Sequence, residues 1–354
     1  MKKLKHILYV IFVDGLAGMA FGLFATLIIG TILQQIGTLL GGRIGDLVWL
    51  IGKVAMVLTG AGIGLGVGVK LKASQLTSLS AMVAGMIGSF AGKLLDGSIL
   101  NGTALNVVGV GEPLGAFLAA LTAVGIGALV AGKTRVDILV TPLCTVLGGA
   151  AVGLVVGPPI SAFMVRLGAL VNWGVEQQPL LMGIVVSVLM GMFLTLPISS
   201  AAIGVILNLS GLAAGAATVG CCCNMVGFAV ASLRENRVGG LLAQGLGTSM
   251  LQMPNIVRRP VIWLPAILSS AILGPVGTMV FQITDNATGA GMGTAGLVGP
   301  LMTWQTMTQT QAPGTVAWKI ALMLFILPAL LSWVFSELMR KKGWIRPGDM
   351  KLDF

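Results

Sequence analysis

Long apolar runs separated by short polar or basic stretches dominate this chain. The longest lies between Gln177 and Leu233 and contains no charged side chain. A helix rises about 1.5 Å per residue and the hydrocarbon core of a bilayer is about 30 Å thick, so this stretch is too long for one crossing and fits two. The two helices should separate near Pro197 or at residues 208–211. The pattern therefore predicts an all-α membrane protein that crosses the bilayer many times.

Apolar runs bounded by glycine, proline and charge predict nine membrane-spanning helices. A further segment, 160–175, starts after Gly157-Pro158-Pro159 and contains Arg166. It is either a tenth crossing or an amphipathic helix on the membrane surface. We favour ten crossings, because the basic residues described next require an even number. The nine helices are expected near residues 9–33, 47–69, 75–95, 114–132, 138–158, 180–206, 211–232, 261–283 and 316–338.

Basic residues gather in six short clusters between the apolar runs. Lysine and arginine tend to stay on the cytoplasmic side of a membrane, so all six clusters and both termini should face the cytoplasm. The loops in between carry mixed or acidic residues, as the outer face should. The clusters are Lys2, Lys3 and Lys5; Lys70 and Lys72; Lys133 and Arg135; Arg234 and Arg237; Arg258 and Arg259; and Arg340, Lys341, Lys342 and Arg346.

Composition agrees with a location in the cell membrane. The chain is 56% hydrophobic and only 9% charged, and its 52 glycines among 354 residues allow helices to pack closely in lipid. The net charge of +10 lies in the clusters that orient helices, so we expect no nucleic-acid partner. The first apolar run is longer than the ~7–15 residues of a signal peptide and is interpreted as a membrane helix. We expect one membrane-embedded domain over 1–354, with no attached soluble domain.

Side chains suited to catalysis or metal binding are scarce. The single histidine, His6, lies in the basic leader, and no phosphate-binding loop or nucleophile elbow occurs. Cys144 and the run Cys221–Cys223 fall in apolar segments, and three consecutive helical positions cannot clasp one metal. We interpret these cysteines as packing residues, with acylation or redox sensing as alternatives. We expect no catalytic residue, metal or cofactor on this chain.

Three stretches are too polar or too glycine-rich for lipid-facing helices, yet lack the charge of solvated loops. They are 97–113, 238–257 and 284–315. Backbone that leaves helical geometry inside a membrane must bond to protein or to a water-lined cavity, and transporters build substrate sites from such broken segments. These stretches are therefore predicted to be re-entrant. The alternative is that they are ordinary external or cytoplasmic loops.

Glu112 is the acidic residue of the first of these stretches. It lies in GVGEP, between glycines that permit unusual backbone angles and a proline that starts the next helix. A carboxylate there can accept two hydroxyl hydrogen bonds from a sugar-like ligand, and an acid inside a membrane is a candidate for function. Alternatively, Glu112 is a surface acid that favours the helix N-terminus.

The other two stretches offer neutral hydrogen-bonding groups beside an indole. Polyols need both donors and acceptors for their hydroxyls and a flat apolar face for their C–H side. The same residues can instead bind one helix to another. The candidate substrate-binding residues are Gln252 and Asn255, with Gln244 nearby, and Thr303, Trp304, Gln305 and Gln309, with Asn286 and Thr308 nearby.

Two stretches of the sequence resemble segments of a known family of membrane proteins. GVGEP resembles the Gly-Ile-Thr-Glu-Pro loop of the membrane-embedded IIC subunits of the bacterial phosphotransferase system (PTS). The stretch Met253–Pro275 looks like the Asn-Glu-Pro loop and the following proline-rich helix of the same superfamily. The whole chain is similar to a compact IIC-like group of Gram-positive bacteria that is labelled a sugar permease. The resemblance implies a homodimeric transporter that moves its binding domain across the membrane.

The chain also departs from that family in ways that concern phosphorylation. Members that phosphorylate sugar use a membrane-domain histidine and glutamate, together with a soluble subunit or domain. Here no histidine lies in an apolar segment, Glu112 lies in the N-terminal third, and Asn255 stands where an acid would be expected. The resemblance therefore carries over to Glu112 and, less directly, Asn255, and it leaves the coupling of transport to phosphorylation open.

The sequence thus predicts a IIC-like permease for a sugar or another small polyhydroxylated solute. Possible partners are the bilayer, a second copy of the chain and separate soluble components of the system. The chain alone carries no catalytic chemistry, and at most it is the membrane subunit of a sugar phosphotransferase complex. The alternatives are a membrane-embedded receptor or regulator that keeps the ligand pocket without transport and, with little support from so few acid–base groups, an intramembrane enzyme.

Overall fold

The computed structural model describes residues 9–352, which form two compact units. Unit 1 ends at Met164 and unit 2 begins at Val165. The basic leader with Lys2, Lys3, Lys5 and His6 lies outside the described residues.

Unit 1 is built around a long N-terminal rod from Val10 to Leu40 that packs on a helical layer. Glycines set the closeness of this packing. A Cβ atom added at Gly22 would overlap the carbonyl of Gly62, so the two helix backbones lie in direct contact. The elements are η1 (Val10–Gly15), α2 (Leu16–Leu23), η2 (Phe24–Ile28), α3 (Ile29–Leu40), α4 (Gly42–Val57), α5 (Thr59–Lys70), α6 (Gln75–Ser89), α7 (Ala91–Leu95), β1 (Leu100–Asn101), β2 (Ala104–Leu105) and α8 (Pro113–Val130).

Helix α9 (Asp137–Val175) contains the boundary between the units. It has 39 residues and continues through Pro158 and Pro159, where the sequence predicted a break. The expected separate helices at 138–158 and 160–175 are therefore one helix, and the independent tenth crossing is a wrong prediction. A proline removes one backbone donor and disfavours helix, but the turns on either side of this pair still hold the helix together.

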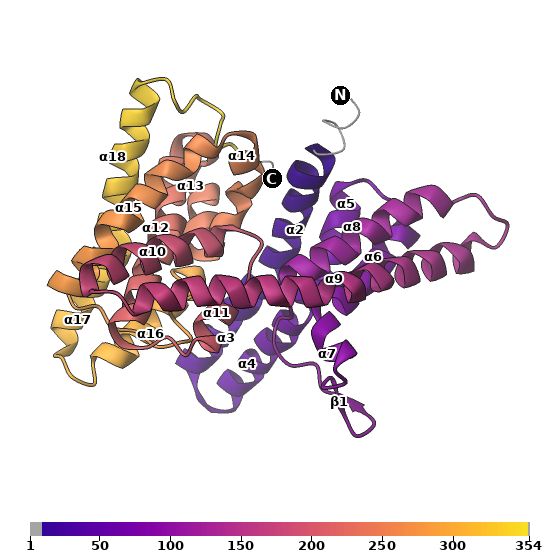
Figure 1. The fold of residues 1–354 in the computed structure, drawn as a ribbon, viewed down its shortest axis with the longest axis horizontal. Helices are drawn as coiled ribbons and strands as arrows, with labels where there is room; N and C mark the ends of the chain where they lie inside the picture. Colours follow the sequence, from indigo (N-terminus) through magenta and orange to yellow (C-terminus); the bar gives the residue numbers. More distant parts are fainter. Residues whose placement is uncertain (1–8, 353–354) are drawn as a thin grey trace. The chain divides into compact units, whose positions relative to one another are not determined.

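Unit 2 is organised around α12, which is enclosed by protein on nearly all sides. Nearly all of the residues of α12 are buried inside the protein, and helices α10, α15 and α18 pack against α12 (Figure 1). The elements are α10 (Pro179–Thr195), α11 (Ser200–Ile206), α12 (Gly211–Ala231), α13 (Leu233–Leu242), η3 (Ala243–Gly247), η4 (Ser249–Gln252), α14 (Met253–Arg258), η5 (Pro260–Trp263), α15 (Leu264–Pro275), η6 (Val276–Val280), η7 (Ala295–Leu297), α16 (Val298–Met307), α17 (Pro313–Ile320), η8 (Ala321–Ile326) and α18 (Leu327–Lys341).

The all-α, multi-spanning architecture is confirmed, with fewer full-length spans than the ten we expected. Among residues 9–352, six helices are long and apolar enough to cross a bilayer, or seven if α4 and α5 form one span bent by 55°. Two predicted crossings are too short to be counted this way. Helix α6 has 15 residues and α10 has 17, and the latter ends at Thr195, just before Pro197.

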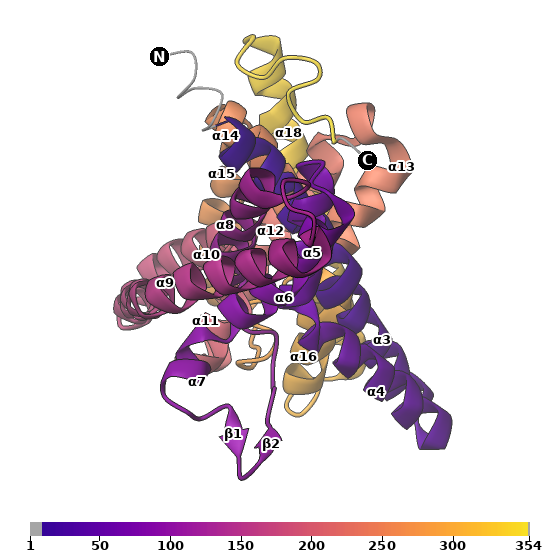
Figure 2. The same ribbon diagram turned by 90° about the vertical axis from the view of Figure 1, so that its right-hand side faces the viewer.

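The three stretches predicted to be re-entrant have different structures. Residues 97–108 form a mostly exposed loop with the β1–β2 hairpin, although Ile99 is buried, and the hairpin projects beyond α7 in both views (Figures 1 and 2). Gly97 and Gly102 have φ of +74° and +63°, so this part turns as an ordinary loop does. The re-entrant prediction is wrong for that part. The stretches 238–257 and 284–315 do leave helical geometry while largely packed inside unit 2.

Candidate functional site

Two broken segments enter unit 2 from opposite ends. We call residues 238–257 the first broken segment and residues 284–315 the second. Both views place α14 of the first and α16 of the second at opposite ends of unit 2 (Figures 1 and 2). The first lies at the end with the C-terminal turn of α18, where the arginines and lysines gather.

The two broken segments meet beside α12. The Thr294 hydroxyl donates to the main-chain carbonyl of Gly245 over 2.5 Å and also contacts the sulfur of Met225 on α12 at 3.6 Å. Each segment leaves the helix at this point. Thr248 is extended, with φ −159° and ψ 140°, and Leu297 has a left-handed φ of +61°. Broken helices that meet from opposite ends are the geometry from which transporter sites are built.

A buried polar network lies next to this meeting point. We call Asn224, Thr195, Ser249, Ser270 and Trp263 the Asn224 centre. The Asn224 Oδ1 atom accepts from Thr195 Oγ1 at 3.2 Å and from Trp263 Nε1 at 2.9 Å, and its Nδ2 donates to Ser270 Oγ at 3.4 Å. The hydroxyls of Thr195 and Ser249 are 2.8 Å apart.

The Asn224 centre joins five elements, with Trp263 at the end of η5, and contains the groups that a polyol needs. Thr195 ends α10, Asn224 lies on α12, Ser249 starts η4 and Ser270 lies on α15, and all four are fully buried. Hydroxyls and an amide can exchange their mutual hydrogen bonds for those of a ligand, and the Trp263 ring offers an apolar face. Sequence reasoning sought this chemistry on other residues. The available signal was the asparagine inside an uncharged run.

Asp285 is a second polar feature that sequence reasoning missed. It is 1% exposed, and no other charged side chain of the described chain is as deeply buried. Its Oδ2 accepts from Thr218 on α12 at 2.5 Å and from Thr303 on α16 at 3.1 Å. Burial raises the pKa of this carboxyl, which lies outside the spanning helices, to about 7, and the hydrogen bonds oppose that rise. Asp285 thus fixes the second broken segment to α12.

Gln252 and Asn255, two of the predicted ligand residues, bind the end of the chain. Gln252 Nε2 donates to the carbonyl of Met350 and to Gln244 Oε1, each at 2.9 Å. Asn255 Nδ2 donates to Gln252 Oε1 at 2.9 Å and to the carbonyl of Lys351 at 2.8 Å. In this structure the two amides therefore join the first broken segment to the residues that follow α18, as the alternative interpretation of the sequence expected.

The predicted residues of the second broken segment lie in two environments. Thr303 is fully buried and bonds to Asp285. Trp304, Gln305 and Gln309 are exposed and lie at the α16 end of unit 2. The structure therefore brings Thr303 to the carboxylate and leaves the indole and the two amides on the surface, away from Gln252 and Asn255 at the opposite end.

Glu112 lies in unit 1, apart from the other predicted residues in the chain. It precedes α8 in extended conformation, follows Gly111 with φ +69°, and its N–H donates to the Ser89 carbonyl at 2.7 Å. Its Oε1 is buried and has no hydrogen-bond partner within the described part of the chain. Burial raises its pKa to about 7. An unsatisfied buried carboxylate oxygen is costly, and a ligand hydroxyl would relieve that cost.

Comparison with known proteins identifies one family. Residues 13–352 match the family model described as "Phosphotransferase system, EIIC". No curated protein matches the chain.

Proposed function

We infer that this chain, which belongs to the phosphotransferase system EIIC family, carries a sugar or a similar small polyhydroxylated solute across the cell membrane. An EIIC subunit is the membrane component of a sugar transport system and works with other components of that system. The apolar helices of both units suit a multi-pass membrane protein. The finer assignment to a polyol, and to the site described next, is our proposal.

The observation that carries the proposal is the meeting of the two broken segments beside the Asn224 centre. Thr294 of the second segment bonds to Gly245 of the first, and Ser249, four residues on from Gly245, belongs to the centre. If the segments separate, hydroxyl and amide groups become free without exposing any charge. A solute with several hydroxyls can take up those bonds, and an apolar solute cannot.

The other predicted ligand residues have different parts in this proposal. The Glu112 carboxylate, with its unpartnered oxygen, is a separate acceptor for solute hydroxyls within unit 1. Trp304, Gln305 and Gln309 form an exposed indole and amide surface where a sugar can first bind. Gln252 and Asn255 become available only when the chain end that they bind moves away.

Three further features belong to the same proposal. Basic clusters at the α14 end support a cytoplasmic orientation of that end and of the C-terminus, and the basic residues Lys2, Lys3 and Lys5 in the sequence support the same orientation for the N-terminus. The chain acts as a homodimer, as the family resemblance implies. Coupling to sugar phosphorylation would use a phosphorylated soluble partner, as the family resemblance implies.

Uptake into proteoliposomes tests the proposal. Purified protein is reconstituted, and radiolabelled hexoses, disaccharides and hexitols are offered one at a time, with protein-free liposomes as the background. Asn224→Leu should abolish uptake of whichever solute is carried and Ser249→Ala should reduce it. Asn101→Leu, in the exposed hairpin, should leave it unchanged. Binding without uptake would favour a receptor, and neither binding nor uptake of any polyol would contradict the proposal.

A further inference from the structure

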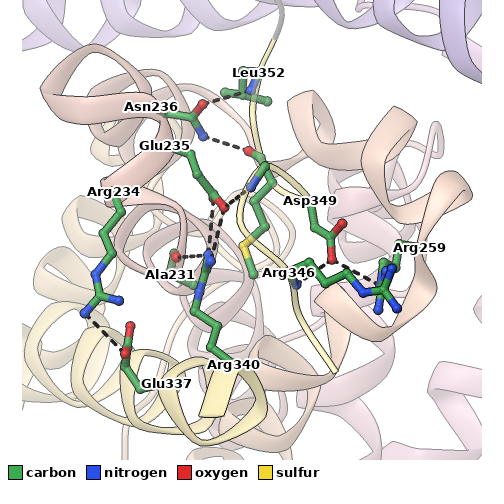
Figure 3. A network of polar contacts seen from close by, with 12 residues as sticks. Ala231, Arg234, Glu235, Asn236, Arg259, Glu337, Arg340, Arg346, Asp349 and Leu352 are labelled. Atoms are coloured by element: carbon green, nitrogen blue, oxygen red, sulfur yellow. Dashed lines mark hydrogen bonds and ion pairs between the residues drawn. The ribbon is translucent and has the colours of Figure 1, made fainter. Parts of the chain in front are cut away.

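The chain end after α18 folds back over the first broken segment. We call Lys342–Leu352 the strap. Figure 3 shows its polar contacts with α13 and with the residues after α14. Most of these contacts use the main chain of the strap. Asn236 donates through Nδ2 to the Met350 carbonyl at 2.8 Å and accepts through Oδ1 from Leu352 N–H at 2.8 Å, and Glu235 accepts from Gly348 N–H at 2.9 Å.

One ion pair and buried apolar side chains hold the strap in place. Arg259 pairs with Asp349 of the strap at 3.1 Å (Figure 3). A second ion pair, at 3.1 Å, joins Arg340 of α18 to Glu235 of α13, the same glutamate that accepts from Gly348 of the strap. Met350 is fully buried and Ile345 is 1% exposed, in one cluster of apolar side chains from α12, α14, η5 and α18. The strap is thus seated by specific contacts along most of its length.

The strap is connected to the Asn224 centre through a single short turn. The four residues of η4 carry Ser249 at one end and Gln252 at the other. Ser249 contacts Thr195 of the centre at 2.8 Å, and Gln252 donates to the strap carbonyl of Met350 at 2.9 Å. Any movement of η4 that frees Ser249 must therefore either break the hydrogen bond between Gln252 and the Met350 carbonyl or move the strap together with η4.

Loss of the strap would leave buried groups without partners. Gln252 and Asn255 each use one N–H on a strap carbonyl, and Gln252 is fully buried. A buried donor that loses its partner is costly unless water or a ligand replaces it. The seated strap therefore favours the closed arrangement of the first broken segment, and an empty seat favours an open, hydrated one.

We propose that the strap is a latch that keeps the first broken segment closed over the Asn224 centre, and that this segment opens when the strap leaves its seat. This inference builds on the proposed function, since it identifies which element gates the solute site. It requires no knowledge of the solute, so it can be tested separately.

The test measures whether weakening the strap exposes Ser249. Full-length protein with Ser249→Cys is treated with a water-soluble maleimide, and peptide mapping gives the labelling rate at each cysteine. Met350→Ser removes a buried strap side chain and Asp349→Asn removes the ion pair with Arg259. Lys351→Gln is the matched control, because its side chain is exposed and only its main chain binds.

We expect each of the two variants to raise labelling at position 249 by roughly tenfold, Met350→Ser through loss of apolar burial and Asp349→Asn through loss of an ion pair. Lys351→Gln should leave the rate unchanged. The buried run Cys221–Cys223 reports unfolding, because α12 must open before it reacts. Equal labelling in all variants, rapid labelling with the strap intact, or labelling of Cys221–Cys223 in step with position 249 would each overturn the latch.

The outcome is independent of the uptake assay. Selective exposure of position 249 in a protein that carries no polyol would retain the latch and remove the transport proposal. Uptake of a polyol together with strap variants that leave labelling at position 249 unchanged would retain the transport proposal and remove the latch.

Discussion

Thr294 and Gly245 are joined by a hydrogen bond from the threonine hydroxyl to the glycine carbonyl, and this bond links two segments that enter unit 2 from opposite ends. Both segments have lost regular helix there, so their main-chain groups depend on side chains and on each other. Met225 of α12 lies against the same hydroxyl. The contact is therefore a point at which a small movement of either segment changes the hydrogen bonding of the other.

Close helix packing around α12 gives a stability prediction. A Cβ atom at Gly220 would overlap the Ser187 carbonyl of α10, whereas nothing lies within 4 Å of a Cβ at Gly239 of α13. Gly220→Ala should therefore lower the free energy of unfolding by about 1–3 kcal/mol through overpacking. Gly239→Ala should be neutral or slightly stabilising, since alanine favours helix. Thermal unfolding in detergent compares the two, and an equally stable Gly220→Ala protein would contradict the packing.

Glu112 should contribute to affinity in a pH-dependent way once a solute is known. Glu112→Gln loses charge-assisted bonds of about 1.5–3 kcal/mol each, so affinity should fall by roughly one to two orders of magnitude. Because its pKa is raised to about 7, wild-type affinity should rise as pH increases through that value and the glutamine variant should show a flat profile. Glu176→Gln, at an exposed position, is the control.

Normal binding by Glu112→Gln at every pH would make Glu112 a helix-start acid only. The ligand residues would then be those of unit 2 alone. The measurement is equilibrium binding on the purified protein, so a change in expression or membrane insertion does not enter the result.

Asp285 should make the protein less stable as pH rises. Its pKa is 3.8 as a free carboxyl and about 7 in the fold because of burial, so the folded protein holds a proton that the unfolded chain has lost between these values. Stability rises with pH only where the unfolded state binds more protons, and here it binds fewer. The thermal midpoint should therefore fall between about pH 4 and pH 7. Asp285→Asn should reduce that fall, and Asp46→Asn, at an exposed position, should not.

The orientation proposed from the basic clusters has its own test. Reporter fusions at the C-terminus and cysteine labelling within 34–46, at the turn between α3 and α4, and within the second broken segment should place the C-terminus in the cytoplasm and both labelled stretches outside. The physical reason is that Arg258 lies in the last turn of α14 and Arg340 in the last turn of α18, and that Figure 1 shows α14 at the end opposite α16. A C-terminus on the outer side would contradict the positive-inside assignment.

The sequence supports the fold class well because apolar length and charge spacing are local properties. The broken character of 238–257 and 284–315 was also predictable from glycine and polar content. Two local features were predicted wrongly. Pro158 and Pro159 do not end α9, and the glycines of 97–108 form a surface hairpin and not a buried turn.

The sequence predicted the kind of groups at the candidate site, neutral hydrogen-bonding side chains beside an indole, but not which residues come together there. Gln252 bonds to Met350, 98 residues further along the chain, and no local pattern reveals such a partner. Asn224 lies on a helix that is buried on nearly all sides, so no polar stripe marks it. Asp285 resembles a loop acid in sequence, and only the return of its segment to Thr218 buries it.

The central claim is that a polyhydroxylated solute binds at the Asn224 centre, and a structure determined with the transported sugar bound tests it most directly. We predict that the sugar lies within hydrogen-bonding distance of Asn224 and Ser249, that Thr195 and Ser249 no longer bond to each other, and that Trp263 contacts a sugar ring face. A bound sugar elsewhere, with the Thr195–Ser249 and Asn224–Trp263 hydrogen bonds unchanged, would contradict it.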